Sequence, residues 1–281
     1  MGNMTNSVPA SVHALHVYPV KALGGLSLSE TAIEPWGPAG DRRWLITDAD
    51  GRVITQREQR RLALASAEAL PGGAVRLSAP GREPLDVAVP EPVGTEPVTL
   101  FGTKYEAVPA GSAAASWLSD HLGVEARLLH MDDPAHRRAI APGFARAGET
   151  VSFADGFPLL VTTLASLDAL NSLIAQGDLP DEGPLPMNRF RPNVVLDGTA
   201  PWAEDDWQRI TIGEVTFRVA KPCGRCIVTT TDQASAERGK EPLRTLARHR
   251  RIAGALVFGQ NLVPENTGVL RTGDPVTFPE G

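Results

Sequence analysis

Short β-rich runs separated by turn residues set the strongest limit on the fold of this chain. His13–Val20, Leu26–Ile33 and Trp44–Thr47 are rich in residues that favour strands, and Gly, Pro or Asp residues follow them closely. This spacing is typical of β-barrels rather than of a helical bundle or a doubly wound parallel sheet. Further runs of this kind lie at Ala74–Leu77, Leu85–Val89, Val98–Phe101, Ala126–Leu129, Leu159–Thr162, Asn193–Asp197, Arg209–Ile212, Val215–Val219, Ala255–Phe258, Leu262–Val263 and Val276–Phe278.

Turn and helix signals complete the expected secondary structure. Asp50-Gly51 predicts a hairpin between Trp44–Thr47 and Val53–Thr55, and Gly213-Glu214 predicts another between Arg209–Ile212 and Val215–Val219. Periodic apolar residues or a proline start predict helices at Ser112–Leu122, Leu164–Ala175 and Pro242–His249, and Pro134–Gly148 is expected to be a polar loop. We therefore expect a mostly β fold with some α (α+β).

Size and charge narrow the class of protein. With 281 residues the chain allows two domains, and we place the first, mostly β unit at residues 11–124 and the second at 125–281. A net charge of −6 argues against nucleic acid as the main partner. No apolar run is long enough for a membrane span, and no secretion signal is present. Only two cysteines occur, so we expect a cytoplasmic protein.

The segment Lys221-Pro222-Cys223-Gly224-Arg225-Cys226 is the strongest chemical signal in the sequence. Cationic neighbours favour the thiolate form of a cysteine, and a thiolate is a soft metal ligand. Other interpretations stay open: a zinc site, which would need about four ligands; a thiol-redox pair, which usually opens a helix; or two inert buried cysteines.

Three further clusters carry cations. In Asn188–Asn193 (NRFRPN), Arg189 and Arg191 flank Phe190 before a strand, where they form either a phosphate clamp or an ordinary surface loop. Tyr18–Lys21 and Asp41–Trp44 each place a cation beside a strand end. The runs Arg57–Arg61 and Arg248–Arg251 are expected to be solvated surface.

Taken together, these segments resemble one known family. The chain is similar to proteins that join an N-terminal β-barrel domain to a molybdenum cofactor sulfurase C-terminal (MOSC) domain, and within them to the amidoxime-reducing component and its bacterial relatives. The matching segments run over nearly the whole chain: YPVK at 18–21, DRRWL at 41–45, ASLDALN at 165–171, RFRPN at 189–193, KPCGRCIVTTTD at 221–232, KEPLRTL at 240–246, FGQN at 258–261 and GDPV at 273–276. The resemblance implies two β-barrel domains with peripheral helices.

The resemblance also implies site residues. Cys226, not Cys223, corresponds to the molybdenum ligand, with Arg225 beside it to tune the metal or guide an anionic partner, unless it is a salt-bridged structural residue. The positions expected to contact the molybdenum cofactor are Lys21, Arg42 and Arg191, which match phosphate-holding residues, together with Ser166, Asn193 and Gly224. Ala22 and Gly224 stand where the family often has Ser, which removes two hydroxyl groups but no cation and not the thiolate.

The implied activity is the reduction of N-hydroxylated compounds such as amidoximes, hydroxylamines and N-hydroxy bases, by removal of oxygen at molybdenum. Two cysteines are too few for an iron–sulfur cluster, so an external ferredoxin, flavoprotein or haem protein is expected as the electron donor. Two alternatives remain: a carrier of the cofactor or of sulfur without turnover, and a non-catalytic binding module, including a thiol-redox or metal-binding one.

Overall fold

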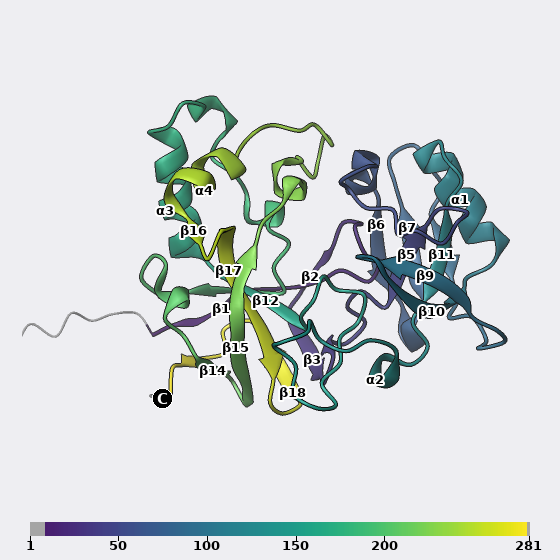
Figure 1. The fold of residues 1–281 in the computed structure, drawn as a ribbon, viewed down its shortest axis with the longest axis horizontal. Helices are drawn as coiled ribbons and strands as arrows, with labels where there is room; N and C mark the ends of the chain where they lie inside the picture. The colour runs from purple at the N-terminus through teal and green to yellow at the C-terminus, as the bar shows by residue number, and fades with distance from the viewer. Residues whose placement is uncertain (1–8, 280–281) are drawn as a thin grey trace, which may run out of the picture.

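The chain folds into two lobes that are built mainly from strands (Figure 1). The structure is a computed structural model and describes residues 9–279. Strand residues outnumber helical ones, which confirms the predicted mostly β class. No helix in this described range is long and apolar enough to cross a membrane.

A nine-stranded sheet forms one lobe. Its path runs β19-β14-β15-β17-β12-β13-β1-β2, with β16 paired to β17. The strands are β1 (Ser11–Val17), β2 (Leu26–Leu28), β12 (Leu159–Thr163), β13 (Val194–Asp197), β14 (Arg209–Ile212), β15 (Val215–Gly224), β16 (Arg251–Ile252), β17 (Ala255–Pro264) and β19 (Val276–Thr277). All pairs are antiparallel except β12 with β13, which is parallel.

The N-terminal strand completes this sheet from a distance in sequence. β1 pairs with β13, so that Leu15 lies opposite Val194. Near the start of β1 the Val12 N–H donates to the carbonyl of Asp274, which lies just before β19. β1 thus approaches β19, the strand at the opposite end of the path, although no continuous ladder joins them. Strand pairing therefore crosses the proposed boundary at residues 124 and 125, and that division of the chain into domains stays a prediction.

The second lobe holds two smaller sheets. One has the order β5-β11-β10-β9 and the other β6-β7-β8, while a three-stranded sheet β18-β3-β4 also joins distant parts of the chain. The elements are β3 (Glu30–Glu34), β4 (Gly37–Pro38), β5 (Trp44–Thr47), β6 (Ser66–Ala69), β7 (Val75–Ser78), β8 (Leu85–Val87), β9 (Glu96–Leu100), β10 (Thr103–Pro109), β11 (Arg127–His130), β18 (Gly268–Arg271) and helix α1 (Ser112–Leu122).

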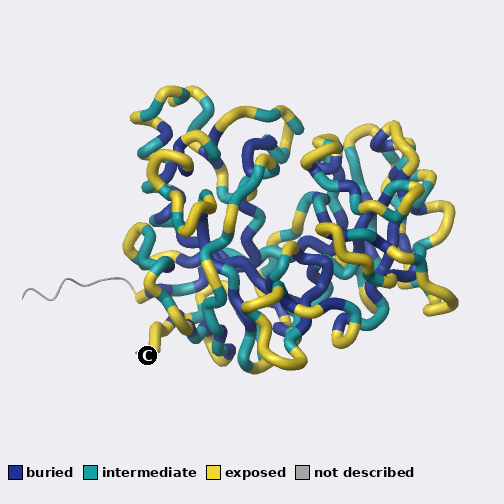
Figure 2. Tube along the Cα trace, in the orientation of Figure 1, coloured by how far each residue is buried: buried dark blue, intermediate teal, exposed yellow. Residues whose placement is uncertain are grey.

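Each lobe has its own hydrophobic core. Figure 2 shows the buried segments in the interior of both lobes and the exposed ones at the rim. Leu62, Leu77 and Leu118 are fully buried in the core that α1 covers. Val12 and Phe217 are buried in the core of the large sheet. Two cores of this kind leave a surface between the lobes where polar residues can face a ligand.

The helices largely follow the predicted ranges. α3 (Leu164–Ala175) begins where the Thr163 hydroxyl accepts the Ser166 backbone N–H, and it spans the expected residues. α4 (Leu243–His249) starts one residue later than expected because Pro242 is its N-cap. The predicted loop 134–148 contains a one-turn helix, α2 (Pro134–Arg137).

The strands differ from prediction at several places. The expected strand Leu26–Ile33 is divided into β2 and β3, and the expected strands Ala255–Phe258 and Leu262–Val263 form one strand, β17. The expected hairpin around Asp50-Gly51 is reduced to an isolated bridge between Thr47 and Val53, because β5 pairs along its length with β11. The β-branched run after Cys226, for which no strand or helix was predicted, forms a 3-10 helix, Ile227–Thr230. The hairpin around Gly213 is confirmed, with Ile212 opposite Val215.

Candidate functional site

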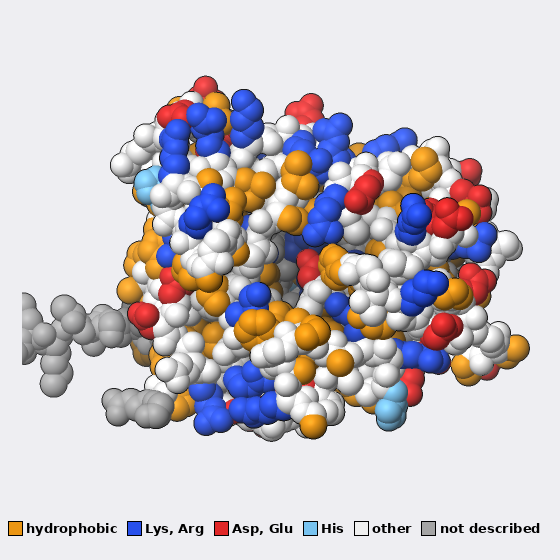
Figure 3. All heavy atoms as spheres, viewed as in Figure 1, with side chains coloured by type: hydrophobic (Ala, Val, Ile, Leu, Met, Phe, Trp, Pro, Cys, Tyr) orange, Lys and Arg blue, Asp and Glu red, His pale blue; other side chains and the backbone are white. Residues whose placement is uncertain are grey.

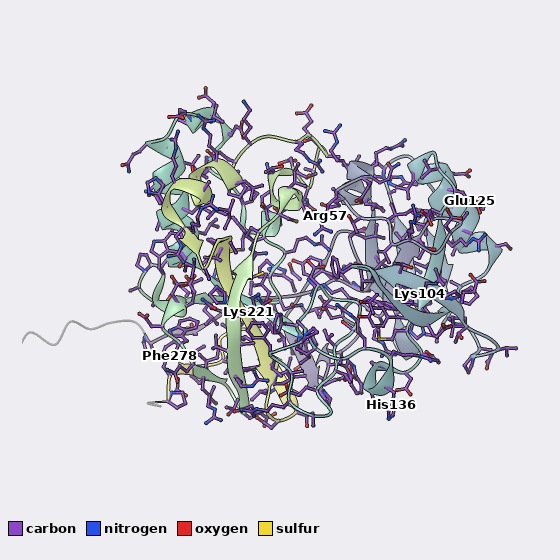
Figure 4. All side chains as sticks on the ribbon, viewed as in Figure 1. Arg57, Lys104, Glu125, His136, Lys221 and Phe278 are labelled. Carbon is purple, nitrogen blue, oxygen red and sulfur yellow. The ribbon has the colours of Figure 1, made fainter. Side chains whose placement is uncertain are left out.

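A cavity of about 400 Å³ lies between the two lobes. Figure 3 shows a hollow at this place, with cationic side chains at its depth and rim. Both halves of the chain line it, and Arg57 and Lys221 come from opposite lobes (Figure 4). The polar and charged lining residues are Lys21, Arg42, Thr55, Gln56, Arg57, Asp155, Arg189, Arg191, Asn193, Lys221, Cys223, Arg225, Cys226, Thr229 and Asn261.

The charge of this lining is opposite to that of the whole protein. Seven of the residues are cationic and only Asp155 is anionic, in a chain whose net charge is −6. Within residues 9–279, Arg57, Arg191, Lys221 and Arg225 form no ion pair with a carboxylate. Keeping uncompensated cations together in one cavity is unfavourable without a ligand, so the cavity fits an anion.

Cys226 presents its thiol to this cavity. It is half-buried and free, and it caps the N-terminus of the 3-10 helix that follows β15. Arg57 Nη2 lies 3.5 Å from its sulfur. Cys223 is also free, and burial raises the pKa of its thiol, with Arg225 opposing that effect. The two cysteines line one cavity but have different neighbours.

Arg225 is fixed by backbone carbonyls rather than by a salt bridge. Its Nε donates to the Phe258 carbonyl at 3.0 Å and its Nη1 to the Phe190 carbonyl at 3.1 Å. Nη2 is buried and has no hydrogen-bond partner within the described range. The alternative of a salt-bridged Arg225 is therefore wrong, and one buried donor remains for a ligand.

Tyr18 supports two of the predicted cations. The guanidinium carbons of Arg42 and Arg191 lie 4.4 and 4.3 Å from its ring centroid. The ring packs so closely on Gly25 that a Cβ there would lie 2.4 Å from Tyr18 Cε1. Burial lowers the pKa of Arg191 to about 10, and it remains charged at neutral pH. Arg42 and Arg191 thus meet at one ring although the sequence separates them.

Asn193 holds Arg42 in place and has no free polar atom. Its Oδ1 accepts from Arg42 Nη1 at 3.0 Å and from the Leu160 N–H at 3.2 Å. Its Nδ2 donates to the His16 carbonyl and to Asp41 Oδ1. Asn193 lines the cavity and these bonds position Arg42, while its predicted direct contact with the cofactor stays a prediction.

Lys21 is buried beside the cavity and reaches two oxygens. Its Nζ donates to the Phe153 carbonyl at 2.9 Å and lies 2.5 Å from Asp155 Oδ1. Burial lowers the pKa of Lys21, while its charge lowers the pKa of Asp155 below the ordinary value. The Asp155 side chain is 81% exposed, so it holds the ammonium weakly and an anionic ligand can compete with it.

Ser166 is the predicted residue that the structure does not bring to the site. It is fully buried, and its hydroxyl donates to Glu204 and accepts the Trp202 N–H. Ser166 is absent from the cavity lining and its hydroxyl helps to fix the start of α3, so its expected contact with the cofactor stays a prediction. Gly224 does lie in the lining, where a Cβ would meet only Ala255, at 3.8 Å.

Sequence patterns did not identify Arg57 as a site residue, and they marked Lys221 only as a cation near the cysteines. Arg57 stands in the run expected to be solvated surface, and it is exposed like Arg60 and Arg61, but it also lines the cavity. Two contacts bring its segment to the site: Gln56 exchanges amide hydrogen bonds with Gln233, and Arg238 donates to the Gln56 carbonyl. No local signal reveals these contacts because they join residues that are far apart in sequence.

Comparison with known proteins identifies two family domains in this chain. Residues 9–125 match the MOSC N-terminal beta barrel domain and residues 148–277 match the MOSC domain. Mitochondrial amidoxime-reducing component 1 of Mus musculus is 33% identical, over 95% of this chain and 81% of the relative, and the Homo sapiens protein is 32% identical over 95% and 82%. Molybdenum cofactor sulfurase of Oryza sativa is 28% identical over 92% of this chain and 33% of the relative. This chain therefore belongs to the MOSC family and carries both the N-terminal β-barrel and the MOSC domain.

Proposed function

We propose that this protein binds the molybdenum cofactor in the cavity, with Cys226 as the protein ligand of the metal, and reduces N-hydroxylated compounds. One observation carries the proposal: a free, half-buried thiol opens into a cavity lined by seven cations and one carboxylate. A thiolate is a soft ligand that suits a metal already held by sulfur. Cations suit the phosphate of a pterin.

The residues present fit such a group. The buried Nη2 of Arg225 has no hydrogen-bond partner within residues 9–279, so it can donate to an acceptor on a ligand. Arg191 has no carboxylate partner in that same range, and its backbone carbonyl and the ring of Tyr18 keep it next to Arg42. Lys21, Arg42 and Arg191 would hold the phosphate, and Gly224 leaves room beside the metal ligand.

The division of labour follows from these contacts. When bound, the cofactor supplies the two-electron chemistry that converts an N–OH group into N–H and water, with two protons consumed. The protein would bind and orient the anionic tail through Lys21, Arg42 and Arg191. It would hold the metal through the thiolate of Cys226. Arg57 places positive charge 3.5 Å from that sulfur, and Arg225, which directly precedes Cys226, adds a second cation to the cavity lining. The electrons would come from an external ferredoxin, flavoprotein or haem protein.

The names of the relatives support this reaction class but also favour one alternative. Both groups of relatives match over 90% of this chain, but the match spans 81% of the amidoxime-reducing component's own length and only 33% of the molybdenum cofactor sulfurase's. A carrier of cofactor or sulfur without turnover is the second candidate.

Two free cysteines fit the reducing environment of the cytoplasm, where we place the protein.

Metal analysis and turnover together test the proposal. Protein made in a cofactor-competent host is expected to contain about one molybdenum and one pterin per chain. Cys226→Ala should lose the metal while Cys223→Ala keeps it, and the reverse pattern would overturn the ligand assignment. The loaded protein should reduce benzamidoxime with a reduced viologen as donor. Full metal content without turnover would support the carrier instead.

A further inference from the structure

Phe101 is an exposed aromatic residue at the tip of a hairpin. β9 and β10 pair so that Leu100 lies opposite Thr103, and Phe101 and Gly102 form the two-residue turn between them. The side chain is 52% exposed. Among the aromatic residues of the described range only Phe101 and Phe278 are exposed, so packing in the hydrophobic core does not explain why Phe101 is present.

The turn itself gives no reason for a phenylalanine. Phe101 has φ of 52° and Gly102 has φ of 80°, which is the left-handed backbone of a tight hairpin turn. Asn, Asp and Gly are favoured at the first position of such a turn, and a bulky residue there is strained by about 1 kcal/mol. Asn at position 101 would suit the backbone better than the residue that is present.

The ring is not part of the cavity lining, but it lies beside two cations that are. Its centroid is 5.2 Å from Lys21 Nζ and 5.7 Å from the Arg57 guanidinium carbon, and both of those residues line the cavity. Arg57 in turn is 3.5 Å from the Cys226 sulfur. Ile227, which directly follows Cys226, is 42% exposed. Two of the six exposed large apolar side chains in the described range therefore stand next to this site.

We propose that Phe101 is a specificity-determining residue that binds the aromatic or apolar body of the substrate at the cavity entrance. This inference rests on the proposed reduction of N-hydroxylated compounds at Cys226. An aromatic ring stacks on Phe101 while the N–OH group enters the cavity toward Cys226, and Ile227 adds apolar surface. The substrate class is then aromatic amidoximes and aromatic hydroxylamines, which the site takes in preference to small polar N-hydroxy compounds.

A single substitution separates this role from structural ones. Phe101→Asn removes the ring but keeps a residue that suits the turn, so the variant should fold. With metal-loaded protein and a reduced viologen as donor, kcat/KM for benzamidoxime should fall about tenfold through KM, in the range expected when one aromatic contact is lost. The value for hydroxylamine should stay unchanged. Phe101→Tyr, which keeps the ring, should retain wild-type selectivity, and Val93→Asn controls for loss of an exposed apolar residue elsewhere.

The outcomes are distinct. An equal loss for both substrates, or no loss for either, overturns the role of Phe101. A lower molybdenum content in Phe101→Asn would show instead that the ring packs on the cofactor, and it also overturns the proposal. If the wild type contains molybdenum yet reduces neither substrate, the proposed function itself fails. The viologen donor removes protein docking as a source of any difference.

Discussion

Arg57 Nη2 lies 3.5 Å from Cys226 Sγ, although 169 residues separate the two in the chain. The N-terminal half thus places a cation on the thiol that the C-terminal half presents. Gln56 and Arg238 hold this arrangement through hydrogen bonds across the two lobes. The site is therefore complete only when both halves of the chain are docked.

The first prediction concerns Arg57 itself. Arg57→Ala removes the positive charge next to the sulfur but leaves the phosphate-binding cations Lys21, Arg42 and Arg191 in place. We expect the variant to keep its molybdenum and to lose about tenfold in kcat, the size of effect of one charge-assisted hydrogen bond. Metal content and benzamidoxime turnover measure the two quantities. Arg57→Lys should recover part of kcat, and the exposed neighbour Arg60→Ala should not change it. Loss of the metal from Arg57→Ala would contradict this division of roles.

The second prediction concerns the ion pair of Lys21 and Asp155. Asp155 is the single carboxylate among the cavity-lining residues of the described range, and it competes with an anionic ligand for the buried ammonium. Asp155→Asn in cofactor-free protein should bind inorganic pyrophosphate several-fold more tightly by calorimetry. The free energy of unfolding should fall by no more than about 1 kcal/mol, because the Asp155 side chain is solvated. Asp120→Asn, at an exposed carboxylate outside the cavity, is the control. Weaker pyrophosphate binding in Asp155→Asn would show that the carboxylate orders the site instead.

The third prediction is a pH dependence that arises from His130. Burial, reinforced by the charge of Arg43, lowers the pKa of His130 to about 4, and the ring packs 4.5 Å from Trp44. A depressed histidine pKa means that the unfolded state binds the proton first. Stability contributed by the neutral ring is present above about pH 6.5 and is lost as the pH falls toward 4. We expect the free energy of unfolding to drop by roughly 2–3 kcal/mol over this range.

Urea unfolding at pH 7 and pH 5 tests this pH dependence. His130→Gln should lower stability at pH 7 but show a flatter pH profile than the wild type. His249→Gln, at an exposed histidine, should keep the wild-type profile. An unchanged slope in His130→Gln would assign the pH dependence to other groups.

Local sequence patterns predict the residues of the site that lie in short motifs, but not the contacts that those residues make. Cys226, Arg225 and Arg191 lie in distinctive short motifs, and the structure brings all three to the cavity. Ser166 also lies in a matching segment, but its hydroxyl is used by Glu204 and Trp202. Sequence spacing identifies a helix start there, whereas only tertiary contacts decide whether a hydroxyl group is free.

Arg57 and β1 are parts of the structure whose contacts local sequence patterns could not predict. The pairing of β1 with β13 and the approach of Arg57 to Cys226 both depend on long-range docking. Neither has a local periodicity or turn signal, because a strand or a basic run looks the same wherever its partner lies. Short strands were predictable from composition and turns, but their partners were not.

The last prediction concerns Tyr18, whose ring supports Arg42 and Arg191. Tyr18→Leu removes the aromatic surface on which both guanidinium groups lie, so both should lose their fixed positions at the cavity. We expect the molybdenum content to fall several-fold and the free energy of unfolding to fall by about 2–4 kcal/mol, as for other large buried truncations.

Tyr18→Phe is the matched control, because it removes only the hydrogen bond from the hydroxyl to the Pro192 carbonyl. That variant should keep its molybdenum and lose about 1 kcal/mol of stability. Equal metal loss in the two variants would mean that the hydroxyl, rather than the ring, organises the cations. Normal metal content in Tyr18→Leu would mean that Arg42 is held well enough by Asp41 and Asn193 alone.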